Sequence, residues 1–166
     1  MKRLSIKKYV FFSIIIALGI IIDQVTKILA VYFLKPVSTV PIIENVIHLT
    51  YVENRGAAFG MLADSRWVFM LVSSVAILGM LFFLYSGMAG TRLYEISVAM
   101  IISGGIGNMI DRTLLGYVVD MIDFRLIDFA VFNGADSFVC VGAGILILAL
   151  ILDIVRDAKK EKDKKE

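Results

Sequence analysis

Cysteine, histidine and proline are scarce in this chain of 166 residues. Cys140 is the one cysteine and lies in an apolar run, which excludes an internal disulfide and a multi-cysteine metal site. His48 is the one histidine, so there is no His/Cys cluster for zinc and no histidine pair of the HExxH type. With so few cysteines and histidines, we expect neither a metal ion nor another cofactor. The two prolines, Pro36 and Pro41, lie in one short segment.

Net charge is also small, at +2, which does not indicate a nucleic-acid partner. Hydrophobic residues, by contrast, make up 59% of the chain, and the mean hydropathy is +0.86. Soluble domains are usually about 45–50% apolar. The excess of hydrophobic residues indicates that much of the protein surface contacts membrane lipid. The length fits a single integral membrane domain over residues 1–166.

Four segments are long and apolar enough to cross a bilayer, which takes about 20 mostly apolar residues. They cover residues 9–30, 67–85, 94–110 and 138–152. The basic N-terminus resembles the start of a signal peptide, but no small-x-small cleavage site follows the apolar stretch. We therefore expect the first span to be retained. The sequence predicts a membrane α-helical fold with four transmembrane helices.

Basic residues predict how the spans are oriented. They gather in the N-terminal tail, in the C-terminal tail from Arg156 onward, and at Arg92 between the second and third spans. The positive-inside rule places these parts in the cytoplasm. The remaining connections, about residues 31–66 and 111–137, then face outward.

The outward segments show strand patterns. Residues 36–62 contain alternating apolar and polar positions followed by a glycine-containing stretch, which predicts a small sheet on the membrane surface. Residues 117–122 predict a further strand. We expect His48 to lie on the surface of this sheet.

Ionisable groups in or near spans cost about 2.5–3.5 kcal/mol each on insertion scales, so they are candidate functional residues. Asp23 and Lys27 are four residues apart and share a helical face, as an ion pair or as a substrate contact. Asn108, Asp111 and Arg112 follow the small residues at the end of the third span. Gly104, Asn108 and Asp111 share one helical face. For Asn108, Asp111 and Arg112 we favour packing and hydrogen bonding between helices over direct chemistry.

Two further aspartates lie near the outer surface. Asp120 interrupts an apolar stretch, where burial raises a carboxyl pKa, although a surface position on an alternating strand explains it equally well. Asp136 precedes the fourth span, where a helix N-cap is the simpler interpretation. Two adjacent carboxylates share a proton and can act as general base and general acid. On spacing alone, Asp123 and Asp128 are rival partners.

Five stretches of the chain resemble the bacterial lipoprotein signal peptidases, also called signal peptidase II. In the order in which that family has them, they are DQVTK at 23–27, NRGAAFG at 54–60, GNMIDR at 107–112, GYVVD at 116–120 and FNGAD at 132–136. Met121 stands where the family often has an aromatic residue, and it keeps the position apolar.

The resemblance implies four transmembrane helices with an extracytoplasmic sheet-like cradle, in the bacterial cytoplasmic membrane. It implies removal of signal peptides from prolipoproteins before the diacylglyceryl-modified cysteine, without a cofactor, by a site near the extracytoplasmic face. Asp120 and Asp136 match the catalytic aspartates. The positions that match supporting residues of the site are Asp23, Asn54, Gly56, Asn108, Asp111, Arg112 and Asn133. We expect prolipoproteins and membrane lipid as partners, no nucleic acid, and a monomer.

Other membrane functions fit less well. A serine intramembrane protease is disfavoured because His48 lies outside the spans. A presenilin-like protease would carry its acids deep inside two spans. The alternative that stays open is a small proton-coupled transporter or channel subunit, although neither an internal repeat nor a broken helix is evident.

Overall fold

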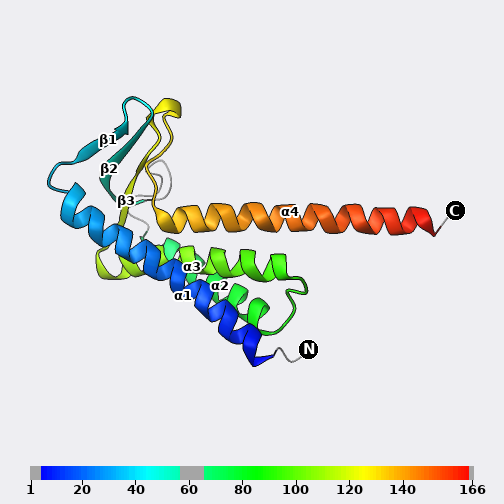
Figure 1. Ribbon diagram of the computed structural model, residues 1–166. Coiled ribbons are helices and arrows are strands. Elements are labelled where there is room, and N and C mark those ends of the chain that lie inside the picture. Colours follow the sequence, from blue (N-terminus) through cyan, green and yellow to red (C-terminus); the bar gives the residue numbers. More distant parts are fainter. Residues whose placement is uncertain (1–4, 57–65, 165–166) are drawn as a thin grey trace.

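The computed structural model describes residues 5–56 and 66–164 (Figure 1). The expected sheet segment at 36–62 therefore lies partly outside the described residues. Helix α1 covers Ile6–Leu29 and continues into the π-helical turn η1, Ala30–Leu34. The other long helices are α2, Arg66–Tyr85, α3, Arg92–Leu114, and α4, Gly134–Asp163. The chain is thus mostly helical, as expected.

Three helical segments in the described part of the chain are long and apolar enough to span a membrane: Ile6–Leu34, α3 and α4. Helix α2 forms where a span was expected, but its described apolar stretch, Met70–Tyr85, is shorter. Helix α3 extends past the expected end at residue 110 because its terminal polar residues find partners on other elements. Helix α4 begins before the expected residue 138 because a capping box starts it at Gly134.

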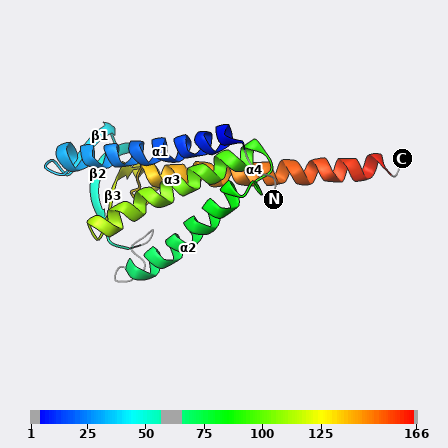
Figure 2. The ribbon, with the colours of Figure 1, turned by 90° about the horizontal axis from the view of Figure 1, so that it is seen from below.

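Helix α3 packs against α1, α2 and α4, and α2 diverges from it toward the sheet end (Figure 2). Small residues allow the close approach of α3 and α4. A Cβ atom at Gly104 would collide with the carbonyl oxygen of Ala135, and one at Gly142 would lie 2.8 Å from the carbonyl oxygen of Ser97. A buried cluster fills the space between α1, α2 and α3; its members are Phe12, Ile16, Ile77, Leu84, Val98, Ala99 and Ile102.

A three-stranded antiparallel sheet lies at one end of the helices (Figure 1). Its strands, in the order β1-β2-β3, are Thr39–Ile43, Ile47–Asn54 and Val118–Asp123. The short helix η3, Arg125–Ile127, follows β3. The expected strand at 117–122 is confirmed as β3. Ala30, Leu34, Val119 and Met121 form a second buried cluster, which fixes the sheet to the end of α1.

The expectation that His48 lies on the sheet surface was wrong. It is 6% exposed, and its neighbours on the adjoining strands are Pro41 and Asp123. Neither ring nitrogen has a hydrogen-bond partner among the described residues. The alternation of β2 indicated that one face is buried, but it did not indicate which face carries His48.

Candidate active site

Asp120 lies on β3, almost completely buried, at 1% exposure. The alternative of a surface carboxylate was therefore wrong. The side-chain amide of Asn54 donates to its Oδ2 at 3.0 Å, and that of Asn133 donates to its Oδ1 at 2.6 Å. Burial raises the pKa of Asp120 to about 6, and the charge of Asp136 adds to the rise. The hydrogen bonds from Asn54 and Asn133 act in the opposite direction and lower this pKa. This carboxyl therefore keeps its proton to a higher pH than an ordinary aspartate.

Asp136 lies in the first turn of α4, where it is half-buried. It is not the N-cap, as the simpler interpretation had it; Asn133 is. Asn133 Oδ1 accepts from the amide of Asp136 at 3.0 Å, and Asp136 Oδ2 accepts from the amide of Asn133 at 3.2 Å, which completes a capping box. Asp136 Oδ1 accepts from the side-chain amide of Asn108 at 2.7 Å. Both oxygens of the Asp136 carboxylate thus accept hydrogen bonds.

Asn133 joins the two aspartates. It is fully buried and contacts Asp120 through its side-chain amide and Asp136 through its backbone and side-chain oxygen. The same amide also donates to Asn108 Oδ1 at 3.1 Å. The fold therefore brings Asp120 of β3 and Asp136 of α4 to the same asparagine.

The rival aspartates have other surroundings. Asp123 accepts from Thr50 at 2.7 Å and from Arg125 at 3.0 Å, near the other end of β3. Asp128 follows η3 in a left-handed conformation, with φ of 48°. In the described part of the chain, neither shares a hydrogen-bond partner with Asp120 or Asp136.

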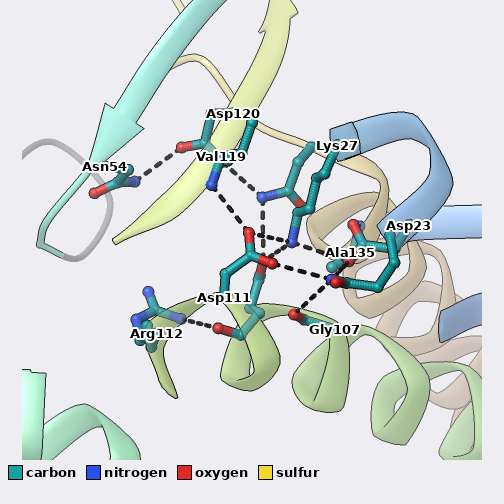
Figure 3. A network of polar contacts seen from close by, with 12 residues as sticks. Asp23, Lys27, Asn54, Gly107, Asp111, Arg112, Val119, Asp120 and Ala135 are labelled. Carbon is teal, nitrogen blue, oxygen red and sulfur yellow. Dashed lines mark hydrogen bonds and ion pairs between the residues drawn. The ribbon is translucent and has the colours of Figure 1, made fainter. Parts of the chain in front are cut away.

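A buried ion cluster supports this arrangement (Figure 3). The ammonium of Lys27, 3% exposed, lies 2.9 Å from Asp23 Oδ2 and 3.0 Å from Asp111 Oδ2. It also donates to Asn108 Oδ1 at 2.9 Å. Gln24 donates to both carboxylates and to the carbonyl oxygen of Gly107. Asp23 thus forms the ion pair that its spacing from Lys27 allowed.

The two carboxylates of the cluster each hold a backbone amide beside a candidate catalytic residue. Asp23 Oδ1 accepts from the amide of Ala135 at 2.8 Å, one residue before Asp136. Asp111 Oδ2 accepts from the amide of Val119 at 3.0 Å, one residue before Asp120. The ion cluster therefore positions the backbone on both sides of the site.

Arg112 and Gly56 lie at the edge of the cluster. Arg112 donates to the carbonyl oxygens of Asn108, at 3.5 Å, and of Gly56, at 3.4 Å. The amide of Gly56 donates to Asn54 Oδ1 at 3.0 Å. This tie keeps the end of β2 against α3 and leaves the Asn54 amide directed at Asp120.

The structure thus gathers every site residue that the sequence singled out. It adds Gln24, and it places Lys27, which the sequence paired with Asp23 but which was not matched to a site residue of the family, at the centre of the ion cluster. Both lie in the 23–27 stretch that carries the family resemblance, so that stretch was the available signal. Across residues 5–56 and 66–164, no group of three or more His, Cys, Asp or Glu side chains is placed to hold a metal ion.

Comparisons with known proteins agree on one family. The family model described as signal peptidase (SPase) II matches residues 15–152. A lipoprotein signal peptidase of Caldanaerobacter subterraneus is 49% identical over 133 residues, which are 80% of this chain and 90% of that protein. One of Clostridioides difficile is 47% identical over 144 residues, 84% of this chain and 94% of that protein.

Solved structures of bacterial membrane enzymes are also similar to this chain. A bacterial membrane enzyme superposes with a TM-score of 0.77 at 29% identity, over 87% of this chain and 89% of that one. A second structure with the same description gives a TM-score of 0.76 at 30% identity, over 84% and 92%. With its membrane-spanning helices, small sheet and matched motifs, the chain belongs to the signal peptidase II family.

Proposed function

We propose that this protein is an aspartyl endopeptidase that removes signal peptides from prolipoproteins, cleaving before the diacylglyceryl-modified cysteine. The observation that carries the proposal is the convergence of Asp120 and Asp136 on Asn133. Membership of the signal peptidase II family, and relatives named lipoprotein signal peptidase, support the substrate class. The family assignment also favours a peptidase over a transporter that uses the same carboxylates.

The pair acts with one shared proton. Its carboxylate accepts a proton from a water molecule, whose oxygen attacks the scissile carbonyl carbon. Its carboxylic acid donates to the carbonyl oxygen, which gives a gem-diol. As the gem-diol collapses, one of its hydroxyls returns a proton to the carboxylate of the pair, and the leaving amine takes the proton of the carboxylic acid. The C–N bond breaks and the pair again carries one proton. No metal or cofactor takes part in these steps.

The surrounding charges suit a singly ionised pair. Lys27 and Arg112 are balanced by Asp23 and Asp111, so these four residues bring no net charge. Amides of Asn54, Asn108 and Asn133, which are neutral, donate hydrogen bonds to the pair. One negative charge is then stabilised by oriented dipoles, whereas a second would be opposed by burial and by the first.

We also propose four spans, with α2 as the second, and both termini in the cytoplasm. The start of α1 and the end of α4 lie away from the sheet (Figure 1). That end carries the basic tails and Arg92, which supports a cytoplasmic location. The aspartate pair then lies near the extracytoplasmic face, where a lipid-modified substrate in the outer leaflet reaches it by lateral diffusion. The chain acts as a monomer.

The test is processing of a diacylglyceryl-modified prolipoprotein by purified protein in detergent. Asp120→Asn and Asp136→Asn should each lower the rate by at least about 100-fold, the lower end for loss of a general acid or base. Asp128→Asn is the matched control and should cleave at the wild-type rate. Thermal unfolding in the same detergent checks that each variant is folded. Near wild-type processing by either Asp120→Asn or Asp136→Asn would refute the assignment.

A further inference from the structure

A cavity lined by charged residues lies at the opposite end of the helices from the sheet. It has a volume of about 310 Å³ and is lined by Lys7, Lys8 and Phe11 of α1 and by Arg92 and Glu95 of α3. Figure 1 shows that α1 and α3 both begin at this end. The residues of the aspartate pair take no part in it, so it requires a separate explanation.

The lining carries an excess of positive charge. Glu95 is 4% exposed and pairs with Lys8, whose ammonium lies 2.6 Å from its Oε1. Lys7 and Arg92 are exposed, and among the described residues neither has an acidic partner within 4 Å. The internal pair therefore leaves two cations available to an anion from outside.

Arg92 is held in a fixed orientation. Its guanidinium carbon lies 5.0 Å from the centroid of the Phe11 ring, in cation–π contact. It also lines a smaller cavity with Asp153, whose carboxylate is already occupied by Arg156 and by the hydroxyl of Tyr94. One face of the guanidinium is covered by the ring, and its N–H edge suits the two oxygens of a phosphate.

In the proposed topology, the cavity lies at the level of the cytoplasmic membrane interface. Tyr9 and Tyr85 stack beside it with ring centroids 5.7 Å apart, and tyrosine is enriched at this level of a bilayer. Lys7 heads a lipid-facing stripe on α1, since Val10 and Ile14 follow at helical spacing and are 52% and 51% exposed. A phospholipid whose phosphate binds Lys7 would thus place its acyl chains along this stripe.

We propose that this cavity is a binding site for the phosphodiester headgroup of an anionic glycerophospholipid. Lys7 and Arg92 bind the phosphate, Lys8 contributes charge while paired to Glu95, and the acyl chains lie along Val10 and Ile14. Each cation near a membrane surface contributes about 1 kcal/mol to binding of anionic lipid. The site is independent of the peptidase chemistry, because the aspartate pair lies at the other end of the helices.

The test measures lipid binding to the purified full chain in detergent by native mass spectrometry. Phosphatidylglycerol and phosphatidylcholine with the same acyl chains are titrated separately. Phosphatidylglycerol should bind at least tenfold more tightly. The double variant Lys7→Gln/Arg92→Gln should lose about 30-fold in affinity for it, which corresponds to about 2 kcal/mol at about 1.4 kcal/mol per factor of ten.

Two control variants separate a site from general surface charge. Lys159→Gln/Lys162→Gln removes the same charge from the exposed end of α4 and should bind within twofold of wild type. Lys7→Arg/Arg92→Lys keeps the charge and should retain most of the affinity. Equal loss in the Lys159/Lys162 variant, or no preference over phosphatidylcholine, would overturn the proposal. Displacement of the lipid by millimolar inorganic phosphate would also overturn it, since the site would then take free phosphate.

Discussion

The ammonium of Lys27 is the centre of the buried ion cluster, so its removal tests how the site is held together. In Lys27→Met the apolar stem is kept and only the charge and its three donors are lost. Asp23 and Asp111 then remain almost fully buried with no cation between them. Loss of one partner from a buried ion pair costs about 3–5 kcal/mol. We expect the free energy of unfolding to fall by that amount.

Lys27→Met should also lower the rate of cleavage, and not only because the variant is less stable. Lys27 also donates to Asn108, whose amide holds Asp136, and its partners hold the backbone beside both catalytic candidates. Without the ammonium, the carboxylates of Asp23 and Asp111 repel each other, which displaces the backbone amides of Ala135 and Val119 that they hold. We therefore expect kcat to fall even at temperatures where the variant is folded.

The assay is unfolding by titration with SDS in mixed micelles, followed by circular dichroism. Lys35→Met is the matched control, because the Lys35–Glu53 pair has a similar length, 3.0 Å, but is reached by solvent on both sides. The triple variant Asp23→Asn/Lys27→Met/Asp111→Asn should recover part of the loss, since it leaves no unpaired charge. If Lys27→Met were no more destabilising than Lys35→Met, the cluster could not be buried as described.

Four further predictions follow from the geometry. Because Asp120 has a pKa raised to about 6, the pair loses its shared proton as pH rises through that value, so kcat/KM should fall above about pH 6. Asn54→Ala removes a donor that favours the charged form and should move this limb to higher pH; a shift to lower pH would contradict the reasoning. His48→Leu should leave the free energy of unfolding unchanged or raised, because it removes two unpaired buried nitrogens, and a loss above about 2 kcal/mol would contradict this. Gly104→Ala should cost about 1–3 kcal/mol by overpacking, whereas Gly144→Ala, which meets open space, should be neutral or stabilising in the same titration.

Much of the fold was predictable because its signals are local. Hydropathy over about 20 residues identified where the helices lie, and alternation identified β3 within one residue at either end. Small residues near the end of the third span correctly indicated close packing with a neighbouring helix. The acids at the helix ends were recognised as unusual from their apolar surroundings alone.

What each polar residue does was decided by tertiary structure. Asp23 bonds the amide of Ala135, which is 112 residues away in the sequence, and Asn54 reaches Asp120 across 66 residues. Periodicity carries no information at such separations. For that reason spacing left Asp123 and Asp128 as rivals, placed His48 on the wrong side of the sheet, and assigned to Asp136 the cap that Asn133 provides. The sequence by itself determined a membrane protein with acids at one end, and its motifs matched Asp120 and Asp136 to the family's catalytic aspartates. Only the packing of α1, α3, α4 and β3 decided that both acids reach Asn133, because those contacts join separate elements of the fold.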